Sequence, residues 1–570
     1  MKNSDVASLL LNIANLLDIK GEKFFKTRAY RIAAQTILDL SEDIEEVVKK
    51  KRLQEIPGIG SALAKKIEEY ISTGKLLYLE TLQNEIPISV LDLLDIPSIG
   101  PKKVATIYQT LNITSISELK KACQTQKIRH LDGFGELSEI NILRGIALLE
   151  KTQGRTLLHY ASLVNKKLIS YLKNNSYVAQ ISTAGSLRRK KETIGDLDIL
   201  VASSNPDAVM DYLVLYPQLK HILMKGKTKT SILLSNDFQV DVRVVKEESF
   251  GAALQYFTGS KENNVAIRGL ALKNGYKLNE YGLYNKKTEK KIAGKSEEEI
   301  YHLLHLPFIP PELRENRGEI EQGLQDTLPT LITLSDIQGD LHIHSKYSDG
   351  HDSIKSIVKA AEAIGYAYIG ITDHSQSLHV ANGLNKDQII KKSEEINAIN
   401  KTSKLKVFLG TECDIKADGN LDYDDECLQL FDYVGIGIHT KFKMNEREST
   451  ERITHAMTHP SVTFLAHPTC RLFGNREPLP LNMETIFETA VETNTYLEIN
   501  SFPDRLDLSD VHTKRAKEMG VSFCIGTDSH SIDHLEFMKY GVATARRGWL
   551  EKEDVLNTNS LETIKSFFNK

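Results

Sequence analysis

Hydrophobic spacing divides the chain into a helical first part and a β-rich remainder. Over residues 1–85 apolar positions recur with helical spacing, as at Leu9, Ile13 and Leu16. From about residue 177 short alternating runs replace that pattern: VAQISTAGS, GDLDILVAS, TSILLS and FQVDVRVV. The spacing therefore predicts a bundle of helices, then a sheet, and then a helical and loop stretch that reaches about residue 315.

The last part of the chain alternates short apolar runs with helical segments, which is typical of a parallel α/β architecture. The runs are QGDLHIH, YAYIGITDH, KVFLGTE, YVGIGIH, VTFLAH, TYLEIN and VSFCIGTD. Seven strands are one fewer than a regular (β/α)8 barrel has. Residues 316–335 are polar with few packing positions, so we predict the main linker there.

Glycine-containing units recur in the helical part. EIPGIGSALAKKIEEYISTG covers 55–74, DIPSIGPKKVATIYQTLNI covers 95–113, and LDGFGELSEINILRGI at 131–146 is a degenerate third copy. Gly58, Gly60 and Gly100 let each turn approach a backbone closely, and N–H groups at the helix start bind phosphate without reading sequence. The repeats predict DNA binding.

Composition places few further limits on function. The chain is 41% hydrophobic and 26% charged, and its net charge of −4 argues only weakly against DNA because charge can be locally segregated. The start of the chain predicts an amphipathic helix and not a signal peptide, and no apolar run approaches the roughly 18 residues that span a bilayer. Five scattered cysteines fit a reducing cytosol. We expect a cytoplasmic, nucleoid-associated monomer without a membrane segment.

Histidine is concentrated in the last part, which holds 12 of the 17 in the chain. Almost every predicted strand there ends in His, Asp or Glu, and the carboxyl ends of parallel strands converge on one face. Imidazoles mixed with carboxylates suit zinc, manganese or iron, and nine candidates exceed what one ion needs. The sequence predicts two or three Mn²⁺, Zn²⁺ or Fe ions that activate water against a phosphoester. The candidate ligands are His342, His344, Asp349, His374, Glu412, His439, His467, Asp528 and His530.

A second cluster lies in the β-rich region. Asp196 and Asp198 sit two residues apart in an apolar strand, so both carboxylates face one side, and Asp241 lies in a second alternating strand. Three carboxylates repel one another unless cations neutralise them, and two Mg²⁺ or Mn²⁺ ions would activate an attacking hydroxyl. Upstream, Gly185 and Ser186 open a turn whose N–H groups suit phosphate. This is the nucleotidyltransferase palm pattern.

These residues carry two resemblances that together cover nearly the whole chain. Residues 336–570 resemble the polymerase-and-histidinol-phosphatase (PHP) domain, with all nine candidate ligands matching. That resemblance implies a distorted seven-stranded barrel, a trinuclear metal site and phosphoester hydrolysis. LQYFTGSKENNVAIRGLALKNGYKLNEYGLY resembles the nucleotide-selection segment of family-X DNA polymerases, the family of DNA polymerase beta. The order of parts is that of the bacterial and archaeal form of the family.

The family-X resemblance implies roles for individual residues. Tyr256 and Phe257 would line the sugar pocket, and Asn264 and Arg268 would contact the incoming nucleotide or the template. The positions that match the triphosphate-binding residues of the family are Ser186, Arg189 and Gly195. Gln239 departs from the family, whose members have an arginine near the third Asp, and this puts the positioning of the primer terminus in doubt.

The front end resembles helix-hairpin-helix units, which implies K⁺ or Na⁺ at the turns. Lys66 occupies the position of the lysine that forms a Schiff base with an abasic sugar in lyase-active relatives. Ala62, however, replaces a basic residue of the phosphate pocket, so an exposed lysine that only contacts phosphate is an equal alternative. Lys26 and Tyr30 would help to hold a 5′-phosphate.

The combined interpretation is a multidomain repair enzyme with a helical helix-hairpin-helix region, an α+β nucleotidyltransferase palm and a distorted (β/α)7 PHP barrel. The expected parts are 1–85 (8-kDa-like), 86–150 (fingers-like), 151–248 (palm), 249–315 (nucleotide selection), 316–335 (linker) and 336–570 (PHP barrel). We expect it to fill short gaps in base excision repair with dNTPs. The barrel would be a 3′→5′ exonuclease or 3′-phosphatase that also cuts abasic sites. Alternatives are a barrel that hydrolyses small phosphate esters or pyrophosphate, and a non-enzymatic DNA-end scaffold.

Overall fold

The computed structural model describes residues 3–568 apart from 23, 39–43, 97–98, 137, 140–141, 144–145 and 147–154. The chain forms two compact units, Met1–Gln153 and Gly154–Lys570, and each is described by itself. The expected boundary at 150 and parts of the third glycine unit at 131–146 lie outside the described residues. Over the described residues, no helix is both long and apolar enough to cross a membrane.

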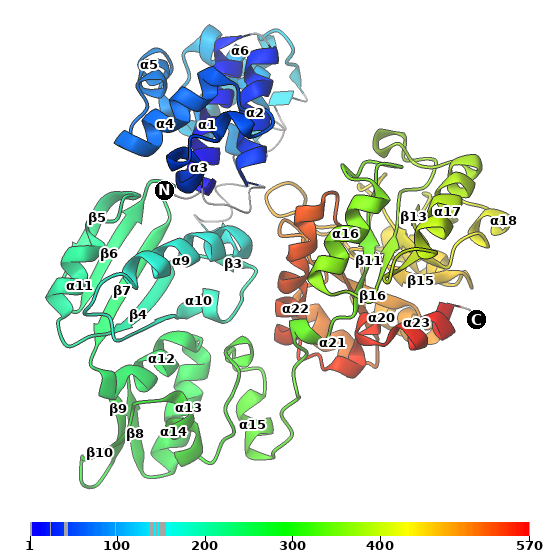
Figure 1. Cartoon of the computed structure of the whole chain (residues 1–570). Helices are drawn as coiled ribbons and strands as arrows, with labels where there is room; N and C mark the ends of the chain where they lie inside the picture. The colour runs from blue at the N-terminus through cyan, green and yellow to red at the C-terminus, as the bar shows by residue number, and fades with distance from the viewer. Residues whose placement is uncertain are drawn as a thin grey trace. The chain divides into compact units, whose positions relative to one another are not determined.

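The first unit is helical where it is described, as its hydrophobic spacing predicted (Figure 1). Its buried core joins Leu10, Ile13 and Leu17 of the first helix to residues of the later glycine units such as Ile67 and Ile107. Its helices are α1 (Asn3–Lys20), α2 (Phe24–Leu38), α3 (Ile44–Lys49), η1 (Leu53–Glu55), α4 (Ser61–Thr73), α5 (Leu77–Glu85), η2 (Ile88–Asp95), α6 (Pro101–Leu111), α7 (Ile116–Gln124) and η3 (Ile128–His130).

The palm is a five-stranded mixed sheet in the order β2-β4-β7-β6-β5, in which β4 and β7 run parallel. All four predicted runs form strands of this sheet, and within it only β5 was missed, an edge strand whose side chains are mostly exposed. Without a buried face, β5 lacks the alternation that marks the others. The palm elements are β1 (Thr156–Leu157), α9 (Leu158–Leu172), β2 (Gln180–Thr183), α10 (Gly185–Arg188), β3 (Thr193–Ile194), β4 (Leu197–Ala202), α11 (Pro206–Leu213), β5 (Leu219–Lys225), β6 (Lys229–Leu234) and β7 (Gln239–Val245).

The nucleotide-selection region adds a three-stranded antiparallel sheet, β10-β9-β8, to the expected helices. The segment expected to be a linker contains the short helix α15, whose Ile320 is buried against the core of this region, as is Leu331. The elements are η4 (Glu247–Ser249), α12 (Phe250–Thr258), α13 (Lys261–Lys273), β8 (Tyr276–Asn279), β9 (Gly282–Asn285), β10 (Lys291–Ala293), α14 (Glu297–Leu303), η5 (Pro311–Leu313) and α15 (Glu319–Leu324).

The predicted seven-stranded parallel barrel is confirmed. Its strands pair in sequence order, and an isolated parallel bridge between Ile343 and Ser529 brings the first strand to the last. Strand interiors are apolar on both faces because helices cover the outside and side chains fill the inside. The strands are β11 (Gly339–Ile343), β12 (Tyr368–Ile371), β13 (Lys406–Asp414), β14 (Tyr433–Gly437), β15 (Val462–Leu465), β16 (Tyr496–Asn500) and β17 (Phe523–Gly526).

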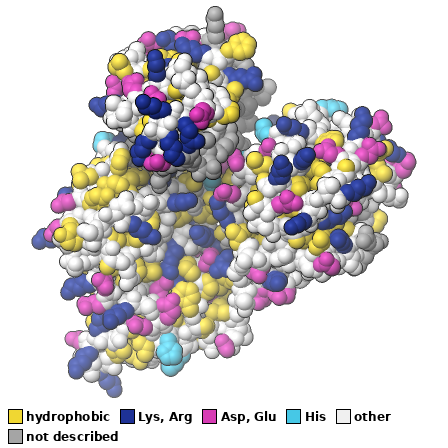
Figure 2. Space-filling model, viewed as in Figure 1, with side chains coloured by type: hydrophobic (Ala, Val, Ile, Leu, Met, Phe, Trp, Pro, Cys, Tyr) yellow, Lys and Arg dark blue, Asp and Glu magenta, His cyan; other side chains and the backbone are white. Residues whose placement is uncertain are grey.

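Helices connect successive strands of the barrel, as βα units require. The connecting helices are α16 (Ile354–Ile364), η7 (His379–Ala381), α17 (Lys386–Asn400), α18 (Asp425–Leu428), α19 (Glu446–Met457), α20 (Met483–Thr493) and α21 (Asp510–Glu518). The short helix η6 (Leu334–Asp336) precedes the first strand, and the last strand is followed by η8 (Ile532–Phe537), α22 (Met538–Arg547), η9 (Lys552–Asp554), η10 (Leu556–Thr558) and α23 (Leu561–Phe568). Lys and Arg side chains are interspersed with Asp and Glu over the viewed surface (Figure 2), which fits the small net charge.

Candidate functional site

The three palm carboxylates lie together at one edge of the sheet. Asp198 on β4 is the cross-strand partner of Asp241 on β7, and Asp196 directly precedes β4. One oxygen from each of the three lies within 4.8 Å of the others. Burial, followed by the charges of Asp196 and Asp241, raises the pKa of Asp198 to about 7. The cluster is thus electrostatically strained and suited to binding divalent cations.

Two neighbours hold the third carboxylate. Lys229 on β6 forms an ion pair with Asp241 at 2.5 Å, and the Gln239 side-chain amide donates to its other oxygen at 3.1 Å. Gln239 therefore gives Asp241 a hydrogen bond but no positive charge. Lys229 carries the nearby positive charge instead, and the sequence analysis missed it because a lysine in a strand gives no specific signal.

The phosphate turn packs directly against the carboxylates. Gly185 begins the four-residue helix α10 with φ +59°, and a Cβ there would lie 2.1 Å from Asp198 Oδ2, so only glycine fits without a shift. Arg189 is engaged, since its Nε donates to Glu315 at 2.9 Å and its Nη1 to the carbonyl oxygen of Thr258 at 2.7 Å.

Ser186 follows Gly185 in the same turn, and Gly195 closes the loop in front of Asp196. A Cβ on Gly195 would lie 3.0 Å from Nη1 of Arg155, a cation that the sequence analysis did not identify. Arg155 is held by its Nε, which donates to the Thr193 hydroxyl at 2.9 Å. The loop therefore has a fixed cation beside its glycine, as an anion site requires.

The residues predicted to line the sugar pocket lie on α12, and those predicted to contact the incoming nucleotide or the template lie on α13. The rings of Tyr256 and Phe257 meet edge to face with centroids 5.1 Å apart, and the guanidinium carbon of Arg243 lies 4.4 Å from the Phe257 ring centroid. The Asn264 amide donates to the carbonyl oxygen of Tyr256 at 2.6 Å, and Arg268 Nε donates to that of Asn264 at 3.1 Å. Four residues separated in sequence thus form one contiguous wall.

The nine barrel candidates converge at the carboxyl ends of the strands or in the loops that follow them. Seven of the nine offer ligand atoms that form three overlapping groups with internal distances within 4.8 Å, and His467 and Asp528 lie beside these groups. Each two groups share one residue, which is the pattern of a site with bridging ligands. The groups are His344–Asp349–His374–His530, His342–His344–Glu412 and His374–Glu412–His439.

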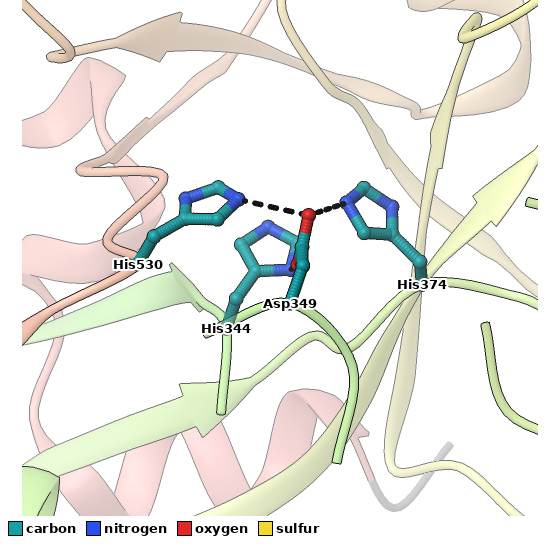
Figure 3. Close-up of side chains that lie close together, drawn as sticks. All are labelled: His344, Asp349, His374 and His530. Atoms are coloured by element: carbon teal, nitrogen blue, oxygen red, sulfur yellow. Dashed lines mark ion pairs between the residues drawn. The ribbon is translucent and has the colours of Figure 1, made fainter. Parts of the chain in front are cut away.

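In the first group, three imidazoles surround the carboxylate of Asp349 (Figure 3). Asp349 Oδ2 lies 3.5 Å from His530 Nε2 and 3.6 Å from His374 Nε2, while its Oδ1 lies 3.8 Å from His344 Nδ1. Burial lowers the pKa of His530, but the hydrogen bond with Asp349 and the charge of Asp528 together raise it to about 9. Without a cation, a proton on the His530 imidazole balances the negative charge of the Asp349 carboxylate.

Glu412 is the centre of the cluster and contacts five imidazoles. Burial favours its neutral form, but the neighbouring histidines, led by His439, hold the pKa of Glu412 well below its ordinary value. The last candidate, Asp528, lies 3.2 Å from His344 Nε2 through its Oδ1. The distances to Glu412 are 3.4 Å from His342, 3.5 Å from His344, 3.2 Å from His374, 3.0 Å from His439 and 2.7 Å from His467.

The donor set fits several metal ions. Buried polar atoms normally have hydrogen-bond partners. Here, within the described part of the chain, several buried atoms of the cluster have none, and all are metal-ligating types. They are His342 Nε2, His344 Nδ1 and Nε2, His374 Nδ1, both Glu412 carboxylate oxygens, His439 Nε2 and His467 Nδ1.

Supporting residues behind the ligands were missed by the sequence analysis. The Glu498 carboxylate lies 2.6 Å from His342 Nδ1 and accepts the backbone N–H of His467 at 2.7 Å. Asp414 lies 3.2 Å from His439 Nδ1. Such partners orient a ligand ring and leave its other nitrogen for the metal. The signal was weak, because Glu498 lies in the middle of the TYLEIN run and not at its end, where the predicted ligands lie in theirs.

The first unit presents two similar helix starts. Gly60 and Gly100 are the extended N-cap residues of α4 and α6, and neither helix has a side-chain hydrogen bond at its N-cap. Their first N–H groups are not occupied by a cap side chain, as a phosphate-binding turn requires. Gly58 has φ +85°, and a Cβ there would lie 2.7 Å from Ile32 Cγ2, so the turn also packs tightly.

Lys66 lies between two tyrosine rings. Its Nζ donates to Tyr30 Oη at 2.5 Å and lies 3.6 Å from the ring centroid of Tyr78, a residue that the sequence analysis missed. Burial, with a smaller contribution from the charge of Lys26, lowers the pKa of Lys66. Lys26 itself forms an ion pair with Glu22 at 2.9 Å. The surroundings of Lys66 are those of an activated amine more than those of a solvated lysine.

Four protein families match parts of the chain. The helix-hairpin-helix domain matches residues 1–76, and the SAM-like helix-hairpin-helix tandem matches 90–146. The DNA polymerase beta thumb matches residues 253–315, and the PHP domain matches 340–502. The order of these matches is the order of parts that the sequence predicted.

Known proteins match either the whole chain or one part of it. DNA polymerase lambda of Rattus norvegicus is 24% identical over 355 residues, which is 55% of this chain and 56% of that one. A probable phosphatase of Thermoanaerobacter sp. (strain X514) is 28% identical over 233 residues, 39% of this chain and 90% of its own. The DNA polymerase/3′-5′ exonuclease PolX of Bacillus subtilis (strain 168) is 39% identical over 573 residues, covering 100% of both. The chain therefore belongs to the bacterial family-X DNA polymerases that carry a C-terminal PHP domain.

Proposed function

We propose that the chain is a DNA polymerase that extends primers at short gaps and trims 3′ ends in its PHP barrel. The observation that carries the proposal is the presence, in one compact unit, of two separate clusters of different chemistry. The palm cluster has three carboxylates, whereas the barrel groups mix imidazoles with carboxylates. Hard oxygen ligands suit Mg²⁺ or Mn²⁺, and the mixed set suits Mn²⁺, Zn²⁺ or Fe.

In the palm, Asp196, Asp198 and Asp241 would hold the ions, and Arg155 and the turn at Gly185 would receive the triphosphate. Divalent cations at either cluster supply Lewis-acid activation of an attacking oxygen and neutralise phosphate charge. Tyr256 would restrict the sugar pocket against a 2′-hydroxyl. Because the pKa of Asp198 is raised by burial and like charges, its carboxylate is primed to exchange a proton for a cation.

In the barrel, Glu412 would lie between ions and the imidazoles around it would complete their ligand shells. Arg505 adds a buried cation, since its Nε lies 3.2 Å from Asp528 Oδ2. Arg505 Nη1 is buried and has no hydrogen-bond partner among the described residues, so it can donate to an anion. A 3′-terminal phosphodiester or phosphate placed there would be polarised on one side and would meet activated water on the other.

We further propose that the two glycine turns of the first unit hold the DNA backbone, with K⁺ or Na⁺ at the turns. Lys66 would be the nucleophile of an abasic-sugar lyase. A borohydride-trapping assay on a duplex with an incised abasic site tests the lyase role. Lys66→Ala should abolish the trapped adduct, and the adjacent exposed Lys65→Ala should not. An adduct that persists in Lys66→Ala would assign this lysine to phosphate contact alone.

These roles support base excision repair, because blocked or mismatched 3′ ends must become hydroxyls before a gap is filled. Incision at abasic sites belongs to the same proposal. A location in the cytoplasm, at the nucleoid, belongs to the same proposal, and the DNA substrate supports it. The monomeric state expected from the sequence stays a prediction.

The central experiment uses the full chain on a labelled one-nucleotide-gapped duplex, with and without dNTPs, in Mn²⁺. Asp196→Ala/Asp198→Ala should lose extension and keep 3′ degradation, whereas His342→Ala/His344→Ala should do the reverse. Reciprocal loss supports two separable sites. A histidine variant that degrades DNA as fast as wild type contradicts the role given to the barrel.

One observation favours a second candidate function for the barrel. The similarity to the probable phosphatase covers 90% of that protein, so a barrel of this kind exists without a polymerase. A small phosphate ester or pyrophosphate would then be the substrate. If free phosphate esters at millimolar concentration suppress 3′-end hydrolysis and are themselves turned over faster than DNA, the small-molecule function is preferred.

A further inference from the structure

The loop after β16 carries Arg505 to the barrel cluster. This loop, residues 502–508, runs from β16 towards α21, and Arg505 Nε reaches Asp528, the candidate ligand that also contacts His344. Neighbouring Leu506 is fully buried, and it packs within the hydrophobic core of the palm and not within that of the barrel. Arg505 of this loop therefore contacts the candidate metal cluster, and the next residue, Leu506, packs in the core of the palm.

Arg471 holds this loop from a second barrel loop, which begins at the candidate ligand His467. Its Nε donates to the carbonyl oxygen of Arg505 at 2.8 Å, and its Nη2 donates to that of Leu506. The Arg471 guanidinium also lies over the ring of Phe473, at 4.6 Å from the centroid. The backbone carbonyl of Arg505 and that of the next residue thus accept from one guanidinium.

The counter-charge for this guanidinium comes from the palm. Glu192 lies in the turn between α10 and β3, three residues before Gly195, and its two carboxylate oxygens accept from Nη1 and Nη2 of Arg471. The Arg471 side chain is only 11% exposed. A cation so poorly hydrated is costly without a partner charge, so removing the Glu192 charge should weaken the position of the Arg471 guanidinium.

We propose that Glu192, acting through Arg471, positions Arg505 beside Asp528, so that hydrolysis in the barrel depends on a palm residue. Glu192 and Arg471 are positioning residues, because neither contacts the cluster itself. The inference rests on the proposed 3′-end hydrolysis. Its consequence is that the loop with the triphosphate glycine of the palm also supports the second active site.

The test measures phosphate release from a 3′-phosphorylated oligonucleotide by the full chain at a series of Mn²⁺ concentrations. Glu192→Gln should lower kcat about tenfold and raise the half-saturating Mn²⁺ concentration, with KM for the oligonucleotide within about twofold. Glu192→Asp, which keeps the charge, should recover most of the rate. A residue with a merely structural role would not lower kcat while leaving KM nearly unchanged.

Glu312→Gln is the matched control. Glu312 pairs with Arg546 of α22 at 2.8 Å, also across to the barrel, but it does not touch the loop of Arg505. Its side chain is 11% exposed against 31% for Glu192, so a loss from general packing should be at least as large in this control. Its rates should stay within about twofold of wild type. If Glu192→Gln and Glu312→Gln lower the rate of phosphate release equally, the effect comes from general packing and the inference is overturned. The same holds if Glu192→Gln loses primer extension to the same extent as phosphate release and also melts at a lower temperature.

The remaining outcomes separate the inference from the function on which it rests. If the wild type releases phosphate and Glu192→Gln has the same kcat and the same Mn²⁺ dependence, the inference is overturned and the proposed 3′-end hydrolysis is not. A wild type that releases no phosphate overturns the proposed 3′-end hydrolysis and the inference with it.

Discussion

The palm and the barrel build their clusters in opposite ways. The palm takes three carboxylates from two adjacent strands and the residue before one of them, so its site is nearly complete within 46 residues of sequence, Asp196 to Asp241. The barrel assembles its nine candidates from His342 to His530, at the ends of six of its seven strands or in the loops that follow them, and β16 supplies none. One site is local in the chain, and the other exists only after the barrel forms.

The charge balance of the two clusters differs as well. Like charges and burial raise the pKa of Asp198 in the palm. In the barrel, histidines around Glu412 hold its pKa well below the ordinary value. A cluster of one sign needs cations to relieve repulsion, while a mixed cluster partly compensates itself with protons on imidazole. Metal removal should therefore affect the two sites differently.

The largest expected effect comes from removing one central carboxylate at each site. Asp241→Asn should lower primer extension on the order of 10³-fold and leave 3′-end hydrolysis unchanged, and Glu412→Gln should do the reverse. The reason is that each carboxylate holds cations for one reaction only. Single-turnover rates on gapped DNA check both. If either variant lowered both activities equally, the two sites would not be independent.

A smaller effect is expected behind the barrel ligands. Glu498→Gln should weaken metal binding about 10–100-fold, because the amide no longer makes the His342 imidazole a stronger donor. A metal titration monitored by calorimetry measures this change in affinity. Asp425→Asn is the control, since Asp425 pairs with His459 at 3.1 Å on the surface. Unchanged affinity in Glu498→Gln would show that His342 needs no oriented partner.

The smallest effect concerns stability and pH in the palm. Because the folded-state pKa of Asp198, about 7, lies above the ordinary 3.8, the folded protein binds a proton that the unfolded chain has lost, and stability falls as pH rises between these values. Asp198→Asn should therefore melt about 2–4 °C higher than wild type at pH 8 in EDTA. The gain should be smaller at pH 5 and in Mg²⁺.

Thermal melts of both proteins under the three conditions provide the comparison. Equal melting temperatures at pH 8 in EDTA would mean that the three carboxylates do not repel one another in the folded protein. A gain that grew towards pH 5 would have the wrong sign for a raised pKa.

Regular elements with a buried face could be predicted, and those without one could not. The seven barrel strands and β4 and β7 were visible as apolar or alternating runs, because burial imposes that pattern. Strand β5 was missed because its side chains are mostly exposed. The helix α15 was hidden in a polar stretch, and its Ile320 packs on residues distant in sequence.

The sequence by itself determined the chemistry of this protein: the carboxylates of the palm, the imidazoles at strand ends and the glycines of the turns, since each is a residue type at a local spacing. The tertiary structure alone decided which groups support them. Glu498 behind His342, Tyr78 beside Lys66 and Glu192 on Arg471 are ordinary residues in sequence. Their roles arise from burial next to a distant charge, and spacing along the chain does not encode that proximity.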